Sequence, residues 1–123
     1  MNAYVAEFIG TAILILFGNG VVANVVLQKT KGFASGWIVI TTGWGLAVMI
    51  AAYSVGTISG AHLNPALTIA LAITGKFALH LVPGYILAQF TGAFTGAVLV
   101  YLAYLPHWSQ TPDPASKLAA FST

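Results

Sequence analysis

Long apolar stretches separated by short polar segments dominate the pattern of this chain. The apolar stretches run from about residue 3 to 27, from 37 to 55 and from 81 to 104. A helix needs about 20 mostly apolar residues to cross the hydrocarbon core of a bilayer. The pattern therefore predicts an all-α membrane protein with three transmembrane helices. The remaining residues, 105–123, contain three prolines and are interpreted as a polar loop or truncated tail.

The segment between the second and third apolar stretches, residues 56–75, breaks this pattern. It begins with the small and polar residues "GTISGAHL", which are typical of a loop. Asn64 and Pro65 then favour the start of a helix, and Gly75 favours its end. A helix from 65 to 74 is about 15 Å long at about 1.5 Å per residue, which is half a bilayer. We therefore predict a re-entrant loop followed by a half-helix; the alternative is a surface loop with an interfacial helix, which the lack of charge disfavours.

Composition narrows the class of protein. Hydrophobic residues make up 59% of the chain and charged residues only 5%, whereas soluble domains are about 25% charged. The net charge of +2 is spread over four lysines, so a nucleic-acid partner is not expected. The chain has no cysteine, and its three histidines lack ligand spacing, so no metal and no cofactor are expected. No nucleophile is paired with a base, so the chain is not expected to be an enzyme.

The N-terminal apolar run is interpreted as a retained span rather than a cleaved signal peptide.

The predicted loop that interrupts the apolar pattern carries groups that can form hydrogen bonds with a solute. Lipid does not tolerate unpaired backbone groups, so such a segment lies inside a bundle or along a water-filled pathway. Carbonyl groups at Gly60, Ala61, His62 and Leu63 can accept hydrogen bonds, and the Asn64 amide can donate one. The half-helix directs its positive dipole end at the same place. These groups suit small neutral molecules that carry hydroxyl groups better than they suit ions.

Three segments carry a family resemblance. "SGAHLNPALTIAL" (59–71) resembles the first Asn-Pro-Ala signature of the major intrinsic proteins, the aquaporins and glycerol facilitators. "AEFIGTAILILFGNG" (6–20) resembles the first helix of that family, and "AQFTGAFTGAVLVY" (88–101) resembles its third. The resemblance implies a bundle of six helices built from two inverted repeats, with residues 3–104 as the first repeat.

The chain departs from the family pattern because it has no second Asn-Pro-Ala and no arginine. The resemblance therefore implies half of a channel that needs a second repeat, whether as a truncated product, a fragment or one part of a split gene. It also implies a homotetramer for the complete protein, within a lipid bilayer.

The resemblance further assigns roles to individual residues. Trp44, 20 residues before Asn64, matches a tryptophan that lines the filter of glycerol facilitators, and an indole can pack against the carbon face of glycerol. The implied solutes are glycerol, water and similar small neutral molecules. The expected pathway comprises Trp44, Gly60, Ala61, His62, Leu63, Asn64, Pro65 and Ala66. Alternatives are a water-selective channel, a non-conducting membrane fragment, and a half-sized transporter that pairs antiparallel with itself.

Several further residues have supporting roles. A carboxylate within a span is usually paired or functional, and the resemblance implies that Glu7 braces the re-entrant loop by accepting backbone N–H bonds. Gln89 is expected to bond to the same loop. The side chain of His62 is expected to pack while its carbonyl group faces the solute. Gly10, Gly92 and Gly96 are interpreted as sites of close helix packing.

The lysines give conflicting indications of orientation. Lys29, Lys31 and Lys117 are expected on one side of the membrane and Lys76 on the other. The positive-inside rule places the group of three in the cytoplasm. The family resemblance instead places the N-terminus and Lys76 in the cytoplasm. We follow the resemblance because so few charged residues are a weak indication of orientation.

Overall fold

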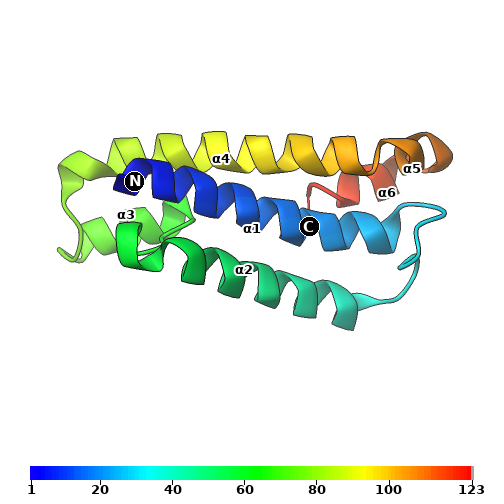
Figure 1. Ribbon diagram of the computed structural model, residues 1–123, viewed down its shortest axis with the longest axis horizontal. Helices are drawn as coiled ribbons and strands as arrows, with labels where there is room; N and C mark the ends of the chain where they lie inside the picture. The colour runs from blue at the N-terminus through cyan, green and yellow to red at the C-terminus, as the bar shows by residue number, and fades with distance from the viewer. Residues whose placement is uncertain (123) are drawn as a thin grey trace.

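The computed structural model describes residues 1–122, all of whose regular elements are helices. Three long helices, α1 (Ala3–Val26), α2 (Trp37–Ser59) and α4 (Val82–Ala103), run side by side along the longest axis of the molecule (Figure 1). All three are long and apolar enough to cross a membrane. The third of these spans consists of α4 and the short 3-10 helix η1 (Leu79–Leu81) that precedes it. The predicted all-α class with three membrane-spanning helices is confirmed.

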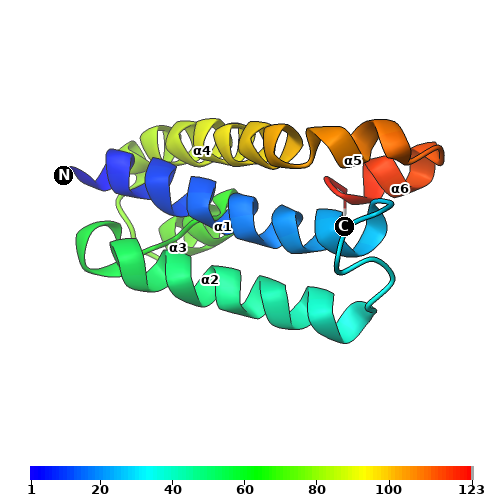
Figure 2. The same cartoon turned by 45° about the vertical axis from the view of Figure 1, so that its right-hand side comes forward.

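Helix α1 lies between α2 and α4 and packs against both (Figures 1 and 2). Glycines permit the close approach. A Cβ atom at Gly92 would collide with the carbonyl oxygen of Phe8, and one at Gly96 would lie 2.6 Å from the carbonyl oxygen of Ala12. The bare backbone of α4 therefore rests directly on the backbone of α1, as the sequence interpretation of these two glycines expected.

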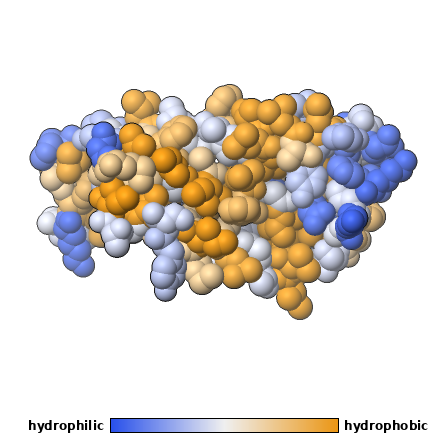
Figure 3. Space-filling model, viewed as in Figure 1, coloured by the Kyte–Doolittle hydropathy of each residue, from blue (hydrophilic) through white to orange (hydrophobic). Residues whose placement is uncertain are grey.

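Much of the outer surface is apolar. Hydrophobic residues cover the middle of the molecule and hydrophilic residues gather at its two ends (Figure 3). On α2, for example, Ile38 is 82% exposed and Tyr53 is 85% exposed. A hydrophobic surface of this kind suits contact with lipid or with another apolar protein surface.

The half-helix α3 (Pro65–Ile73) lies at the end of the bundle that holds the N-terminus, where it packs against α4 (Figure 1). Its nine residues extend over about 14 Å at about 1.5 Å per residue. The chain enters this helix through a non-helical segment, residues 60–64. The re-entrant arrangement is consistent with the sequence interpretation.

The end of the second span differs from the sequence interpretation. Helix α2 continues to Ser59, four residues beyond the predicted end at residue 55. A glycine inside a helix costs only about 1 kcal/mol relative to alanine, so Gly56 does not end it. The helix ends instead at Gly60, whose φ of 83° is left-handed.

The tail contains two short helices, α5 (Leu105–Gln110) and α6 (Pro114–Ala119), where only a loop was expected. A proline lies in the first turn of each, a position where its missing N–H is not needed. Asp113 caps α6, and hydrogen bonds from the Ser116 hydroxyl and the Ala115 N–H lower the pKa of its carboxyl group. Thr111 ties the tail to the end of α1 by accepting the Gln28 N–H at 2.9 Å.

Candidate functional site

The carboxylate of Glu7 is the centre of a buried hydrogen-bond network. Glu7 on α1 is fully buried. Its Oε1 accepts the Ser59 hydroxyl at 2.6 Å and the His62 N–H at 2.9 Å. Its Oε2 accepts the Leu63 N–H at 2.7 Å and the Gln89 amide at 2.8 Å. One side chain thus connects α1 to the end of α2, the re-entrant segment and α4.

The segment that Glu7 holds has an unusual backbone. Gly60, Ala61 and Leu63 have φ values of 83°, 49° and 55°. A left-handed conformation costs a residue with a side chain about 1–2 kcal/mol, so Ala61 and Leu63 keep it only because other contacts enforce it. The Glu7 bonds to the N–H groups of His62 and Leu63 are such contacts.

The carbonyl groups of this segment are left free. The N–H groups of His62 and Leu63 are directed to Glu7, that of Ala61 to the Ser59 hydroxyl at 3.1 Å, and that of Gly60 to the Gly56 carbonyl at 3.0 Å. The carbonyl oxygens of residues 60–63 accept no hydrogen bond from any group within residues 1–122. They remain able to accept hydrogen bonds from a solute or from water.

Asn64 begins the half-helix. Its Oδ1 accepts the Ala66 N–H at 2.8 Å, and its backbone carbonyl accepts the Thr68 N–H at 3.1 Å. Pro65 follows in the first turn, where no N–H is required. Because Oδ1 is occupied by the cap, the NH₂ group is the part of this exposed side chain that can donate to a ligand.

Thr68 is a second centre of the network that the sequence interpretation missed. Its fully buried hydroxyl lies 3.0 Å from His62 Nδ1, accepts the Gln89 amide at 2.9 Å and donates to the Asn64 carbonyl at 3.2 Å. Gln89 therefore bonds to Glu7 and to the half-helix rather than to the loop itself, and it is linked to the loop through Glu7 and through Thr68. A sequence signal existed, since Thr68 is the one polar residue in "PALTIALAI" and lies one turn after Asn64.

The side chain of His62 is packed among aromatic rings. Its ring centroid lies 4.7 Å from that of Phe77 and 4.9 Å from that of Tyr85. The Tyr85 hydroxyl donates to the Ser59 carbonyl at 2.8 Å, a contact that the sequence did not indicate. No cluster of histidine and acidic residues able to hold a metal ion occurs in the part of the chain that the structure describes.

Trp44 and Asn64 line one open cavity of about 340 Å³, although 20 residues separate them in the sequence. Gln89 and Thr11 lie on its wall, and Gln89 Oε1 and Thr11 Oγ1 are buried without a hydrogen-bond partner within residues 1–122. Trp44 also lines a second hollow of about 450 Å³ nearer the other end of α2. The full lining of the first cavity is Thr11, Leu14, Ile15, Trp44, Leu63, Asn64, Pro65, Gln89, Phe90 and Ala93.

The expected pathway residues are only partly brought together. Leu63, Asn64, Pro65 and Trp44 share the cavity, whereas Gly60, Ala61, His62 and Ala66 do not line it. The packing glycine Gly10 lies directly behind it, where a Cβ atom would come within 2.6 Å of the Leu63 side chain. Glu7 does not line the cavity either, but it bonds to two residues that do, Leu63 and Gln89.

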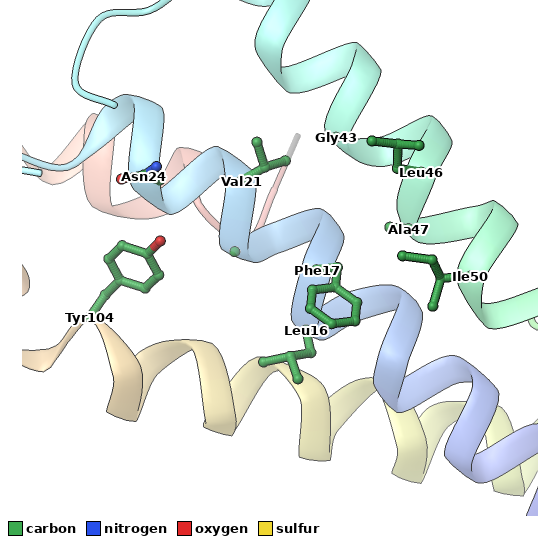
Figure 4. Close-up of a pocket in the computed structure, with 10 residues that line it drawn as sticks. Leu16, Phe17, Val21, Asn24, Gly43, Leu46, Ala47, Ile50 and Tyr104 are labelled. Carbon is green, nitrogen blue, oxygen red and sulfur yellow. The ribbon is translucent and has the colours of Figure 1, made fainter. Parts of the chain in front are cut away.

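A larger hollow of about 510 Å³ lies between α1 and α2 (Figure 4). It is lined mainly by apolar side chains such as Leu16, Phe17 and Ile50, with Asn24 and Tyr104 nearby. It contains none of the residues that the sequence assigned to the pathway, and it lacks the free carbonyls and the half-helix. The cavity with Trp44 and Asn64 is therefore the better candidate for the site.

Three long apolar helices, a half-helix that begins with Asn-Pro-Ala, and a buried glutamate that supports it together define a class of membrane protein. The chain belongs to the major intrinsic protein family, whose pattern matches residues 1–122. This finding confirms the family resemblance and the expectation that the chain is not an enzyme.

Within this family, the chain is similar to proteins named as glycerol uptake facilitators and to an aquaglyceroporin. The chain is 65% identical, over its full length, to a probable glycerol uptake facilitator protein of Thermotoga maritima, of which it covers 53%. It is 62% identical to the glycerol uptake facilitator protein of Bacillus subtilis, covering 45% of that protein. The X-ray structure of the aquaglyceroporin from Plasmodium falciparum superimposes with a TM-score of 0.83 at 38% identity, over 92% of this chain and 46% of the other. The chain thus spans about half the length of these relatives and corresponds to their N-terminal half.

Proposed function

We propose that this chain supplies the N-terminal half of a passive channel for glycerol and similar small neutral solutes. The observation that carries the proposal is the cavity shared by Trp44 and Asn64, at the start of a half-helix fixed by Glu7. The relatives named as glycerol uptake facilitators support the choice of solute.

The proposed mechanism uses the two faces of glycerol. In the cavity, its C–H face packs on the indole of Trp44, while its hydroxyl groups bond to the free Leu63 carbonyl and to the Asn64 NH₂ group. The free carbonyls of residues 60–62, which do not line this cavity, accept hydrogen bonds further along the proposed pathway. Bonds of this kind replace those that the solute made with water. Flux of an uncharged solute through such a passive pathway follows its concentration gradient. The neutral polar groups and the half-helix dipole, which disfavours cations, favour uncharged solutes over ions.

Replacing Trp44 with alanine in the full-length protein tests this assignment. Loss of the apolar wall removes contacts with the carbon face of glycerol, which water does not have. Contacts of this size change discrimination by about tenfold or more, so we expect the ratio of glycerol to water permeability to fall by about that factor. Light scattering from proteoliposomes after an osmotic step measures both permeabilities.

The matched control is Tyr53→Ala, which removes an 85% exposed aromatic side chain from the same helix, α2. It is expected to leave the ratio unchanged. An unchanged ratio in Trp44→Ala would show that the indole does not line the pathway.

The proposal extends to the whole protein. Residues 3–104 form the first repeat and residues 105–123 lead out of it, and a second repeat completes the pore. The complete protein is proposed to be a homotetramer. The share of the relatives that this chain covers supports the need for a second repeat.

We propose that the N-terminus and Lys76 lie on the cytoplasmic side. The N-terminus lies at the α3 end of the bundle (Figure 1), and Lys76 follows α3 directly, with its N–H bonded to the Leu71 carbonyl. The segment between α1 and α2, whose residues include Lys31, lies at the opposite end (Figure 1). Because residues 1–123 contain no cysteine, single cysteines can be introduced here without removing native ones. A membrane-impermeant maleimide added to intact cells is expected to label Lys31→Cys and to spare Lys76→Cys, and inverted vesicles to show the reverse. The opposite pattern in both preparations would reverse the orientation.

A further inference from the structure

The indole of Trp44 rests on a glycine of the neighbouring helix. Gly18 is buried on α1, and a Cβ atom built on it would fall on Cζ3, Cε3 and Cη2 of Trp44. These three atoms belong to the six-membered ring of the indole, so that ring lies directly against the α1 backbone. Even one methyl group at position 18 does not fit while the ring stays where it is.

The position of this ring matters because of what lies on its other sides. Trp44 lines both the cavity that contains Asn64 and the second hollow with Trp37 and Ile40. It also packs against the apolar cluster of Val22, Val25 and Ile40. A ring displaced from α1 would therefore turn into the hollows that it now borders.

We propose that Gly18 is a positioning residue for solute selection: its missing side chain lets the Trp44 indole lie back against α1, and this sets the width of the passage for glycerol. The inference rests on the proposed function, since it takes the passage beside Trp44 to be the solute pathway. Gly18 contacts no solute itself. It acts through the ring, and a displaced ring obstructs glycerol more than it obstructs the smaller water molecule.

The test uses Gly18→Ala in the full-length channel, with Gly20→Ala as the matched control. Gly20 lies on the same helix, and a Cβ atom there would meet nothing within 4 Å. For Gly18→Ala we expect glycerol permeability to fall by about tenfold, which corresponds to about 1.4 kcal/mol of added barrier. Water permeability should fall less, so that the ratio of the two drops, while Gly20→Ala keeps the wild-type ratio.

A compensating variant separates positioning from misfolding. Gly18→Ala combined with Trp44→Phe places a smaller ring beside the added methyl group. Its glycerol permeability should return to that of Trp44→Phe alone. An equal loss of both permeabilities in Gly18→Ala without this recovery would indicate a purely structural role and overturn the inference.

A measurement without transport keeps the inference separable from the proposed function. Trp44 fluorescence can be followed after Trp37 and Trp108 are replaced with phenylalanine, along with any tryptophan in the second repeat. Gly18→Ala is expected to change the quenching of Trp44 by acrylamide, and Gly20→Ala is not. A wild-type channel that passes no glycerol would overturn the proposed function, whereas unchanged quenching and an unchanged permeability ratio in Gly18→Ala would overturn the positioning role alone.

Discussion

Replacing Glu7 with glutamine is expected to destabilise the protein strongly although the two side chains have nearly the same shape. The carboxylate accepts two donors on each oxygen, from Ser59, His62, Leu63 and Gln89. Glutamine keeps one acceptor oxygen and turns an NH₂ group towards the other two donors. Each buried donor left unpaired costs about 1–3 kcal/mol, so we expect a loss of about 2–6 kcal/mol. Thermal unfolding of the purified full-length protein in detergent measures it.

The same variant should lose glycerol flux. The His62 and Leu63 N–H groups bond to different carboxylate oxygens, so the single oxygen of glutamine accepts only one of them, and the left-handed backbone at Ala61 and Leu63 has less to enforce it. The control is Asp113→Asn, which changes an exposed acid and retains the cap of α6. Wild-type stability and flux in Glu7→Gln would show that the network does not support the loop.

Replacing Gly92 with alanine is expected to have the second-largest effect. The added methyl group would collide with the carbonyl oxygen of Phe8, which belongs to the α1 backbone and cannot rotate away as a side chain would. Helices α1 and α4 must therefore separate, and overpacking of this kind costs about 1–3 kcal/mol, sometimes more. We expect the unfolding temperature measured in detergent to fall, and to fall further than it does when an exposed glycine is replaced with alanine.

The matched control is Gly45→Ala in α2. This glycine is also inside a long helix, but a Cβ atom there meets nothing within 4 Å. We expect its stability to be unchanged or slightly raised, since alanine is the better helix former by about 1 kcal/mol. Similar losses in both variants would assign the effect to helix propensity rather than to contact with Phe8.

The spans and the half-helix could be predicted from the sequence because their signals are local. The length of an apolar run decides whether it can cross a bilayer, and Asn64 with Pro65 mark a helix start through their own chemistry. The tail was mispredicted because its prolines were interpreted as breakers. Pro106 and Pro114 instead lie in the first turns of short helices.

The contacts of the site were harder to predict. Helices α1, α2 and α4 are apolar on most of their faces, so the spacing of apolar residues does not show which side faces inward. The hydrogen-bonding roles of Ser59 and Tyr85 depend on which face of α2 and α4 turns inward, and the spacing of residues in those helices does not indicate it. Thr68, the one polar residue of α3, is the exception. Glu7 stood out because it is a lone carboxylate in an apolar run, and its suggested role came from the family resemblance.

The hydrogen bonds of Glu7 also have a consequence for the order in which the chain assembles in the membrane. The carboxylate meets its partners across 52, 55, 56 and 82 residues of sequence. The strained re-entrant segment can therefore settle only after α1 has been inserted, and Gln89 can complete the network only after α4 has followed. Closing such long intervals is entropically unfavourable until many contacts form together. We expect the segment that would face the solute to be the last part of this half to reach its final shape during synthesis.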